Sequence, residues 1–328
     1  MHVVVVGGAG YIGSHVVRLF LDRGHQVTVF DNLSKGTREN LFPEAAFLKG
    51  DILDRQALDS CLAADKTARV DAVIHLAALK AAGESMEKPS AYAVNNIAGT
   101  VNLLAAMEGS GIRACVFSSS AAVYGAPAYL PVDEAHPQNP ENFYGFTKLE
   151  IERILEWYDR LGKMRYASLR YFNAAGYDPE DRIDALEESP ANLIPIVMEA
   201  ALGSRNELEI FGDDFSTRDG SGVRDYIHVA DLAEAHVQAL DYILSKDESV
   251  TVNLGSERGT SVFEVLKAAR RITGRKIPSR VALRRAGDPA ELVASSGLAK
   301  ELLGWEPRYS DIETILSTTW RTYLRVLS

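Results

Sequence analysis

The sequence predicts an α/β protein built on a doubly wound parallel sheet, with a smaller C-terminal α/β lobe. Two observations support this prediction. Strand-like and helix-like stretches alternate through the first half of the 328-residue chain, which is typical of parallel strands joined by helical crossovers. After about Asn173 the alternation becomes irregular, and loops rich in Asp, Glu, Gly and Ser take its place.

The first βαβ unit is the clearest element of the pattern. Residues 3–6 are a β-branched run that predicts a strand, and residues 12–23 predict a helix that ends at Gly24. Residues 26–30 predict a second strand, which leads into Asp31. Further strands are predicted at residues 46–49, 72–76, 114–118 and 165–171, and helices near Leu58, Asn102 and Ile154. Six parallel strands in this order fit a doubly wound sheet.

The chain shows two expected lobes and no flexible linker between them. We expect residues 1–175 to bind the cofactor and residues 176–328 to form mainly the substrate lobe. Residues 224–255 are expected to return to the first lobe. In the second lobe, capping boxes that begin at Ser261 and Ser310 predict the first turns of two helices.

Composition excludes several classes of protein. The 45 acidic and 35 basic residues give a net charge of −10, which disfavours broad attraction to nucleic acid or to anionic lipid. No apolar run is long enough to span a bilayer, and the first residues do not resemble a signal peptide. The two cysteines, Cys61 and Cys115, show no metal-ligand spacing and are interpreted as buried free thiols. We therefore expect a cytoplasmic protein without a metal site, nucleic-acid partner or membrane partner.

Gly7, Gly10 and Gly13 follow the first strand and open the first helix. Glycines at this point let a pyrophosphate approach the helix N-terminus, whose free N–H groups and dipole favour negative charge. Asp31 ends the second strand about 20 residues later, where an acidic side chain accepts hydrogen bonds from an adenine-ribose diol. The pattern predicts a Rossmann-type domain that binds NAD, because Asp31 would repel a ribose 2′-phosphate. Lys35 nearby leaves the phosphorylated cofactor open.

Other cofactor contacts are expected at the carboxyl ends of the following strands. Asp51 and Ile52 lie where an adenine ring could be held, and the small side chains of Ala77 and Ala78 would let the backbone approach the cofactor. Asn95 is either a cofactor ligand or an ordinary helix cap. The predicted cofactor set also contains Tyr11, Ile12, Asn32, Leu76, Lys80, Ser118 and Tyr144.

A catalytic group is predicted from Ser120, Tyr144 and Lys148. Tyr144 and Lys148 lie in YGFTK at the start of a long helix, and residues four apart share one helix face. The Lys148 ammonium is therefore expected to lower the phenol pKa of Tyr144 from about 10, giving a general base for a substrate hydroxyl. Ser120, at the end of a neighbouring strand, can hydrogen-bond the same hydroxyl. Together they predict alcohol oxidation coupled to hydride transfer.

Several longer motifs carry a family resemblance that covers nearly the whole chain. GGAGYIGSH (7–15), FSSSAAVYG (117–125), YGFTK (144–148) and RYFNAAG (170–176) resemble the extended short-chain dehydrogenase/reductase family. Within it, HLAALKAAGES (75–85), GVRDYIHVADLAEAH (222–236) and RRAGDPAELVAS (284–295) resemble the nucleotide-sugar 4-epimerases. The segment GVRDYIHV is the most specific part.

The resemblance implies a reaction on UDP-glucose and UDP-galactose. Tyr144 would remove the proton from the sugar 4-hydroxyl while the C4 hydride passes to NAD, giving a 4-keto sugar that turns over and is reduced from the opposite face. Lys148 would also hold the nicotinamide ribose, and Phe172 would lie beside the nicotinamide. The resemblance further implies a homodimer formed through the helices near Asn102 and Ile154.

By the same resemblance, a set of second-lobe residues would bind the uridine diphosphate. Arginine supports part of this assignment, because a guanidinium matches phosphate oxygens in a bidentate manner. Lys80 would help to polarise the site, although an ordinary loop lysine is an equal interpretation. The predicted substrate set is Lys80, Ser120, Tyr144, Asn173, Asn192, Leu193, Phe211, Arg224, Arg285, Asp288 and Leu292.

The sequence departs from the family pattern at three positions. Ala122 stands where many epimerases have Thr, so Ser120 must act alone, and Ser295 replaces the aspartate of the common LVAD pattern. Leu292 occupies a position that limits room around the sugar 2-substituent, and leucine is smaller than the tyrosine found there. The departure at Leu292 predicts that N-acetylated sugars are also accepted.

Three alternatives are weighed against this function. A 4,6-dehydratase needs an acid and a base after the serines, where Ala121 and Ala122 cannot transfer a proton. A 4-epimerase of UDP-linked pentoses or uronic acids stays open. A non-catalytic regulator that senses NAD would have no reason to keep Ser120, Tyr144 and Lys148 together.

Overall fold

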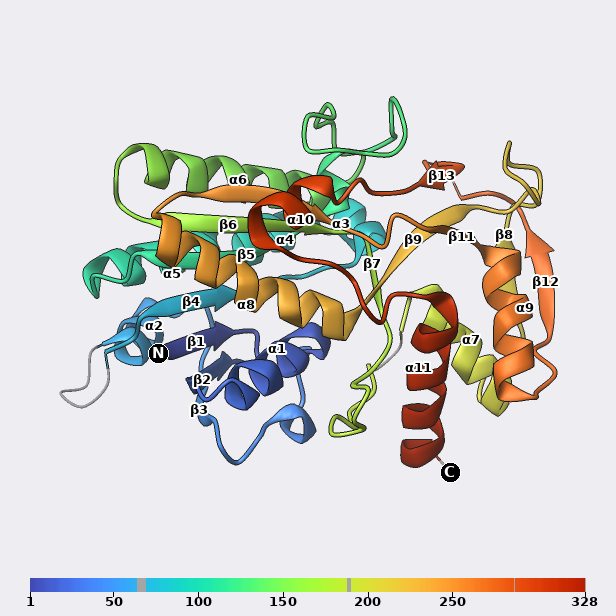
Figure 1. Cartoon of the computed structure of the whole chain (residues 1–328), viewed down its shortest axis with the longest axis horizontal. Coiled ribbons are helices and arrows are strands. Elements are labelled where there is room, and N and C mark those ends of the chain that lie inside the picture. The colour runs from blue at the N-terminus through green and yellow to red at the C-terminus, as the bar shows by residue number, and fades with distance from the viewer. Residues whose placement is uncertain (64–68, 188–189, 286, 328) are drawn as a thin grey trace.

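The computed structural model describes residues 1–63, 69–187, 190–285 and 287–327. Its centre is a seven-stranded parallel sheet, so the predicted doubly wound α/β class is confirmed (Figure 1). Across the sheet the strands are β10 (Val250–Leu254), β6 (Arg165–Tyr171), β5 (Ala114–Ser120), β4 (Ala72–His75), β1 (His2–Val6), β2 (Gln26–Asp31) and β3 (Ala46–Lys49). Six of these strands were predicted, and β10 is the one that was missed.

Helices cover both faces of the sheet because the strands are apolar on both sides. On β1, Val3 and Val5 pack against α1 (Tyr11–Asp22) and α8 (Val229–Lys246). Val4 and Val6 face the other way. They pack against a layer formed by α2 (Arg55–Leu62), α5 (Gly99–Gly109) and α6 (Phe143–Arg160).

The second lobe has its own core and two small sheets. Strand β9 (Val223–His228) pairs with β7 (Asn173–Ala175), β11 (Gly259–Ser261) and β13 (Glu291–Leu292), while β8 (Leu208–Phe211) pairs with β12 (Ser279–Ala282). Helices α7 (Leu193–Leu202), α9 (Val262–Thr273) and α11 (Ile312–Leu327) pack on these strands. In Figure 1 this lobe lies beyond the carboxyl ends of the large sheet.

The segment 224–255, expected to return to the first lobe, divides between the two lobes. Its helix α8 packs on α1, and β10 extends the large sheet beside β6. Its strand β9 instead pairs inside the second lobe, where β7, β11 and β13 satisfy its backbone groups. The chain therefore crosses between the lobes after β9.

Short helices fill several connections between the larger elements. They are η1 (Arg38–Asn40), α3 (Ala82–Glu87), α4 (Pro89–Tyr92), η2 (Ala93–Ala98), η3 (Ala121–Val123) and α10 (Gly297–Leu303). Of these, η2 is a π-helix, a form that often occurs at functional sites.

One of the two predicted capping boxes is confirmed. The box that begins at Ser261 has both of its hydrogen bonds. The box predicted at Ser310 is wrong, because the Ser310 hydroxyl donates to the Asp231 carboxylate at 2.5 Å. Asp311 caps α11 in its place, accepting a hydrogen bond from the Thr314 N–H at 2.9 Å. The tertiary contact to α8 overrides the local capping pattern.

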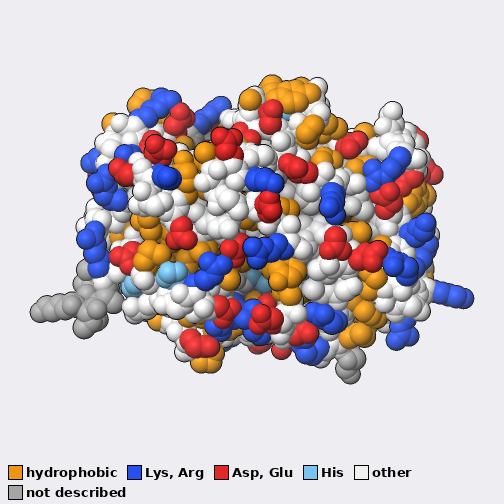
Figure 2. All heavy atoms as spheres, viewed as in Figure 1, with side chains coloured by type: hydrophobic (Ala, Val, Ile, Leu, Met, Phe, Trp, Pro, Cys, Tyr) orange, Lys and Arg blue, Asp and Glu red, His pale blue; other side chains and the backbone are white. Residues whose placement is uncertain are grey.

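Charges are mixed on the face of the molecule that Figure 2 shows. Figure 2 shows Lys and Arg side chains interspersed with Asp and Glu over the viewed face, without a continuous basic area. Cys61 and Cys115 are buried free thiols, as predicted. Burial raises the pKa of each to about 12. Within the described residues, no helix has the length and apolar character needed to cross a membrane.

Candidate active site

The glycine turn brings β1, β4 and α1 into close contact. Gly7 has φ +87°, and a Cβ there would lie 2.6 Å from the Ala77 nitrogen. A Cβ on Gly13 would lie 2.2 Å from the Gly7 carbonyl oxygen, so only glycine fits at either position. Helix α1 begins at Tyr11 with Gly10 as N-cap, and no described side chain caps it. Its first N–H groups are therefore left to bind a phosphate.

Asp31, predicted to bind the adenine ribose, organises this turn. Its carboxylate accepts hydrogen bonds from the N–H groups of Leu33 at 2.8 Å and Ala9 at 3.0 Å. Burial raises the pKa of Asp31, while these two hydrogen bonds lower it. Each carboxylate oxygen accepts one backbone N–H and keeps acceptor capacity for a ribose diol.

The predicted adenine and loop residues line the same edge of the sheet. Asn32 donates to Asp51 at 2.8 Å, which links the ends of β2 and β3. Ile52 is buried beside Gly99. The N–H groups of Leu76 and Ala77 donate to the Val6 carbonyl oxygen, which holds the small-residue loop through Ala78 against the glycine turn.

Helix α6 presents Tyr144 and Lys148 to the carboxyl end of β5. The Asn142 side chain caps Gly145 at 2.9 Å, and Ser85 accepts a hydrogen bond from the Tyr144 N–H at 3.0 Å. Sequence reasoning missed both contacts, although an Asn just before a helix is a recognisable N-cap signal. They fix the first turn of α6 and hence the position of the Tyr144 phenol.

Ser120, Tyr144 and Lys148 converge as the sequence predicted. Lys148 is buried, donates to the Ser118 carbonyl oxygen at 2.7 Å and lies 5.8 Å from the centroid of the Tyr144 ring. Ser120 hydrogen-bonds the Tyr144 phenol. A hydroxyl-bearing substrate at this point would meet a phenol, a hydroxyl and a buried amine within one small region.

The predicted lowering of the Tyr144 pKa is wrong for the protein alone. Burial raises the pKa of Tyr144 to about 12, and the hydrogen bond to Ser120 only partly opposes this. Burial also lowers the pKa of Lys148 to about 7, against a smaller raising effect of Glu152. Desolvation therefore outweighs the proximity of the two groups.

Two predicted cofactor residues, Tyr11 and Lys80, contact the second lobe. The Tyr11 hydroxyl donates to the carbonyl oxygen of Gly176, and its ring packs against Tyr177. The exposed Lys80 ammonium forms an ion pair with Glu187 of the second lobe. Both contacts connect the cofactor domain to residues whose position the sequence did not predict.

Two others have side chains engaged inside the first lobe. The Ser118 hydroxyl hydrogen-bonds His236 of α8 at 3.0 Å, so this residue faces the site with its carbonyl group. Asn95 lies in η2, not at a helix start, and donates to the Asn96 side chain at 2.9 Å. Asn96, which the sequence analysis passed over, is buried and holds the Lys80 loop through the N–H of Leu79 at 2.9 Å.

Ile12 and Phe172, two further residues of the predicted cofactor set, belong to different hydrophobic clusters. Ile12 lies in α1 and is partly buried against the core. Phe172 is buried at the junction of the lobes, in a cluster that Leu292 packs against. This junction lies where β6 ends and the second lobe begins.

Four of the predicted substrate residues are linked in the second lobe. Arg224 forms an ion pair with Asp288 at 3.5 Å, and the Asp288 N–H donates to the Arg285 carbonyl oxygen. The Arg285 guanidinium lies 3.7 Å from the centroid of the Phe211 ring. Asn173 lies at the start of β7, and Asn192 and Leu193 at the start of α7.

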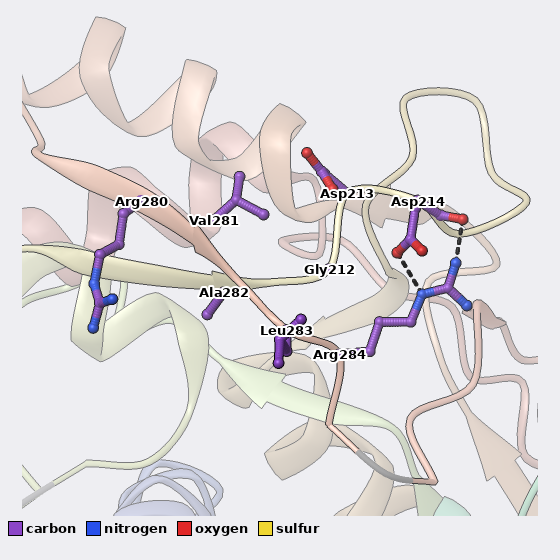
Figure 3. A pocket seen from close by; sticks show the side chains of 8 residues that line it. All are labelled: Gly212, Asp213, Asp214, Arg280, Val281, Ala282, Leu283 and Arg284. Atoms are coloured by element: carbon purple, nitrogen blue, oxygen red, sulfur yellow. Dashed lines mark hydrogen bonds and ion pairs between the residues drawn. The ribbon is translucent and has the colours of Figure 1, made fainter.

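An open pocket that the sequence did not indicate adjoins Phe211 and Arg285. It has a volume of about 810 Å³ and is lined by Gly212, Asp213, Asp214 and Arg280–Arg284 (Figure 3). In it the Arg284 side chain binds Asp214, as Figure 3 shows, and lies 4.1 Å from the centroid of the Phe215 ring. Its lining comes from residues 280–282 of β12 and from the segments that follow β8 and β12.

Comparison with known proteins decides the family. Residues 3–255 match the NAD dependent epimerase/dehydratase family. The chain belongs to this family. Its glycine turn and its Ser120, Tyr144 and Lys148 group all lie inside the matched segment.

Individual relatives agree over the full length. The chain is similar to a UDP-glucose 4-epimerase of Halalkalibacterium halodurans, with 47% identity over 98% of this chain and 95% of the relative. A solved UDP-glucose 4-epimerase from Brucella ovis in complex with NAD has a TM-score of 0.94 and 43% identity, covering 98% of each chain. One from Stenotrophomonas maltophila, with NAD and formylated UDP-arabinopyranose bound, has a TM-score of 0.95 and 39% identity, covering 99% and 98%. The resemblance found in the motifs is thus confirmed.

Proposed function

We propose that this enzyme of the epimerase/dehydratase family interconverts UDP-glucose and UDP-galactose by inverting C4 through a 4-keto intermediate. The observation that carries the proposal is the convergence of Ser120, Tyr144 and Lys148 beside a glycine turn whose helix N-terminus no described side chain caps. The relatives that cover almost the whole chain are named for this activity.

NAD is the cofactor, and the residues present fit it. Gly7, Gly10 and Gly13 leave room for a pyrophosphate at the start of α1, and Asp31 offers acceptors to the adenine ribose. On the nicotinamide side, the buried Lys148 and Phe172 are the side chains we propose to hold the ribose and the ring. When bound, NAD supplies the hydride acceptor and donor for the sugar C4 and a positive charge on its nicotinamide ring.

The protein's own groups handle the proton. The Tyr144 phenolate accepts the proton of the 4-hydroxyl, and later returns it to the oxygen of the opposite epimer. Because burial alone holds the Tyr144 pKa near 12, the phenolate depends on positive charge in the assembled site. Lys148 in its ammonium form contributes that charge, and Ser120 hydrogen-bonds the same sugar oxygen as it becomes a carbonyl.

The uridine diphosphate is assigned to the second lobe. Arg224 and Arg285 are cations that can bind phosphate oxygens, and Phe211 under Arg285 offers a flat apolar face. Asp288 forms an ion pair with Arg224 at 3.5 Å, so an incoming diphosphate would exchange with this carboxylate. Asn173, Asn192 and Leu193 are proposed to complete the grip on the nucleotide.

Leu292 supports a broader choice of sugar. It is half-buried on β13 beside the cluster that contains Phe172, and a leucine there leaves space for a bulky 2-substituent. A second candidate, epimerisation of another UDP-sugar, is favoured by the formylated UDP-arabinopyranose bound in one relative. Both extensions use the same catalytic group.

The test is C4 inversion with purified protein and no added cofactor. UDP-galactose, UDP-N-acetylgalactosamine and a UDP-pentose are compared by NMR of the sugar protons. Conversion of UDP-galactose supports the proposal. In Leu292→Tyr, the rate with UDP-N-acetylgalactosamine relative to the rate with UDP-galactose should fall. If only the pentose is converted, the second candidate replaces the first.

We also propose a homodimer formed through α5 and α6. Large apolar side chains are exposed there, with Val101 at 42% and Trp157 at 59%. Trp157→Arg should give monomers in sedimentation at micromolar concentration, whereas Leu283→Arg, at an exposed leucine of the second lobe, should not. A wild-type protein that sediments as a monomer would contradict the dimer.

We propose a cytoplasmic location, which the two cysteines support. Cys61 and Cys115 are buried and unpaired, which fits a reducing compartment. Localisation of a tagged full-length chain tests this directly.

A further inference from the structure

Glu152, on the helix α6 that carries Tyr144 and Lys148, forms a buried ion pair with Arg170. Glu152 accepts hydrogen bonds from Arg170 Nε at 2.9 Å and Arg170 Nη2 at 2.6 Å, in a bidentate arrangement. The Ser119 hydroxyl donates to the same carboxylate at 2.5 Å. The side chains of Glu152 and Arg170 are only 7% and 5% exposed, so the pair is almost completely desolvated.

The pair continues into a polar chain that reaches the edge strand β10 of the large sheet. Arg170 Nη1 donates to the Tyr124 hydroxyl at 2.9 Å, and that hydroxyl donates to Asn253 at 2.6 Å. These residues come from β6, the turn after η3, and β10. Helix α6 is thereby connected through Glu152 to several strands of the sheet that lies beneath it.

Glu152 also lies one helical turn after Lys148 on α6, and residues four apart share a helix face. Glu152 is the negative charge that acts on Lys148 and opposes the burial that otherwise lowers its pKa. The backbone contact of the ammonium, with the Ser118 carbonyl at 2.7 Å, supplies only a dipole.

Within the described part of the chain, no second negative charge acts on Lys148. From α6 it faces the Tyr144 ring, and from β5 the Phe117 ring at 4.7 Å from the centroid. From β4 it faces His75, whose pKa burial lowers to about 3, so that this side chain is neutral. On β6, the positive charge of Arg170 is bound to Glu152.

We propose that Glu152 is a positioning residue for the reaction, whose carboxylate keeps Lys148 in its charged form beside Tyr144 while Arg170 and Ser119 hold that carboxylate in place. The inference rests on the proposed function only for its consequence in catalysis. A desolvated ion pair is weak evidence for stability as such, because apolar residues often serve equally well. A role in charging Lys148 explains why α6 carries a carboxylate at this buried position.

The test measures Lys148 directly, without substrate. In holoenzyme carrying ¹³C-labelled lysine, the ε-carbon resonance of Lys148 is assigned by its loss in Lys148→Met and then titrated with pH. Glu152→Gln removes the charge and keeps the shape, and should move the Lys148 titration down by roughly one pH unit. The alkaline limb of the pH profile of kcat for epimerisation should also shift to lower pH.

A matched control separates charge from structure. Ser119→Ala removes a hydrogen bond to the same carboxylate but leaves its charge, so it should leave the Lys148 titration in place. Should Glu152→Gln not fold, Glu152→Gln combined with Arg170→Gln leaves neither partner unpaired, and is expected to shift Lys148 in the same direction. An unchanged Lys148 titration in a folded charge-removing variant overturns the proposal, whatever substrate the enzyme uses.

Discussion

Lys148 Nζ donates a 2.7 Å hydrogen bond to the backbone carbonyl oxygen of Ser118. This contact joins the first turns of α6 to the carboxyl end of β5, where the serine run and the tyrosine meet. It positions a buried amine by a main-chain atom, which no side-chain substitution can remove. The catalytic group is therefore held by the sheet itself.

Replacing Lys148 tests whether this amine acts in catalysis. Lys148→Met keeps the apolar stem and removes the charge, so kcat with UDP-galactose should fall by on the order of 10²-fold. Lys163→Met, at an exposed lysine that pairs with Glu108, is the control and should keep wild-type kcat. Equal kcat for the two variants would remove Lys148 from the mechanism.

We expect different outcomes for two Gly→Ala substitutions, one in the glycine turn and one outside it. In Gly13→Ala the new Cβ would lie 2.2 Å from the Gly7 carbonyl oxygen, so the turn must move. We expect the unfolding free energy to fall by about 1–3 kcal/mol and NAD binding to be lost. Gly83→Ala meets nothing within 4 Å and should be neutral or slightly stabilising. Urea unfolding and NAD titration of both variants check this.

Asp31 should control both cofactor affinity and cofactor choice. Asp31→Asn removes the charge that accepts the ribose diol, and the loss of a charged hydrogen bond, about 1.5–3 kcal/mol, predicts NAD binding weakened by roughly 10- to 100-fold. Discrimination against the 2′-phosphorylated cofactor should fall as well. Asp54→Asn, at the N-cap of α2, is the matched control for calorimetric titration. Unchanged NAD affinity in Asp31→Asn would contradict the ribose assignment.

Stability should fall in mild acid because burial lowers the pKa of four histidines. Burial lowers the pKa of His15 and His236 to about 4 and of His75 and His228 to about 3. An unfolded histidine takes up its proton near pH 6.5, whereas the folded ones resist protonation to lower pH. Their contribution is thus complete above about pH 6.5 and is lost as the pH falls toward 4.

The measurement is the unfolding free energy in urea at pH 7.5 and 5.5. His15→Asn keeps a side-chain donor for the Tyr11 carbonyl oxygen, which His15 contacts at 2.8 Å, and removes one titrating group. Its pH dependence should therefore be shallower than that of the wild type. A steeper or equal dependence would show that other groups dominate.

The parts of the site that the sequence predicted share one physical cause. Gly7, Asp31 and Ser120 all lie at the carboxyl ends of strands, and these ends meet at one edge of a parallel sheet. Periodicity therefore suffices to bring them together. Tyr144 and Lys148 were placed by helix spacing alone, and the structure puts both at that edge.

The parts that sequence reasoning missed depend on contacts between distant segments. Tyr11 and Lys80 bind Gly176 and Glu187, and nothing local indicates where the second lobe will lie. Glu152 and Arg170 form a pair only because α6 lies over β6. The direction of the Tyr144 pKa shift was misjudged because spacing shows proximity and not burial.

The account rests most directly on Tyr144, and one comparison tests it. C4 inversion of UDP-galactose is followed by NMR in wild type, in Tyr144→Phe and in the control Tyr129→Phe. Tyr129 is exposed, and among the described residues its hydroxyl hydrogen-bonds only Asp133. We expect Tyr144→Phe to bind NAD as the wild type does and to lose epimerisation by roughly 10²- to 10⁴-fold, with Tyr129→Phe unchanged. Undiminished inversion in Tyr144→Phe would contradict the mechanism, and a wild type that binds NAD but converts no UDP-sugar would point to a non-catalytic sensor of NAD.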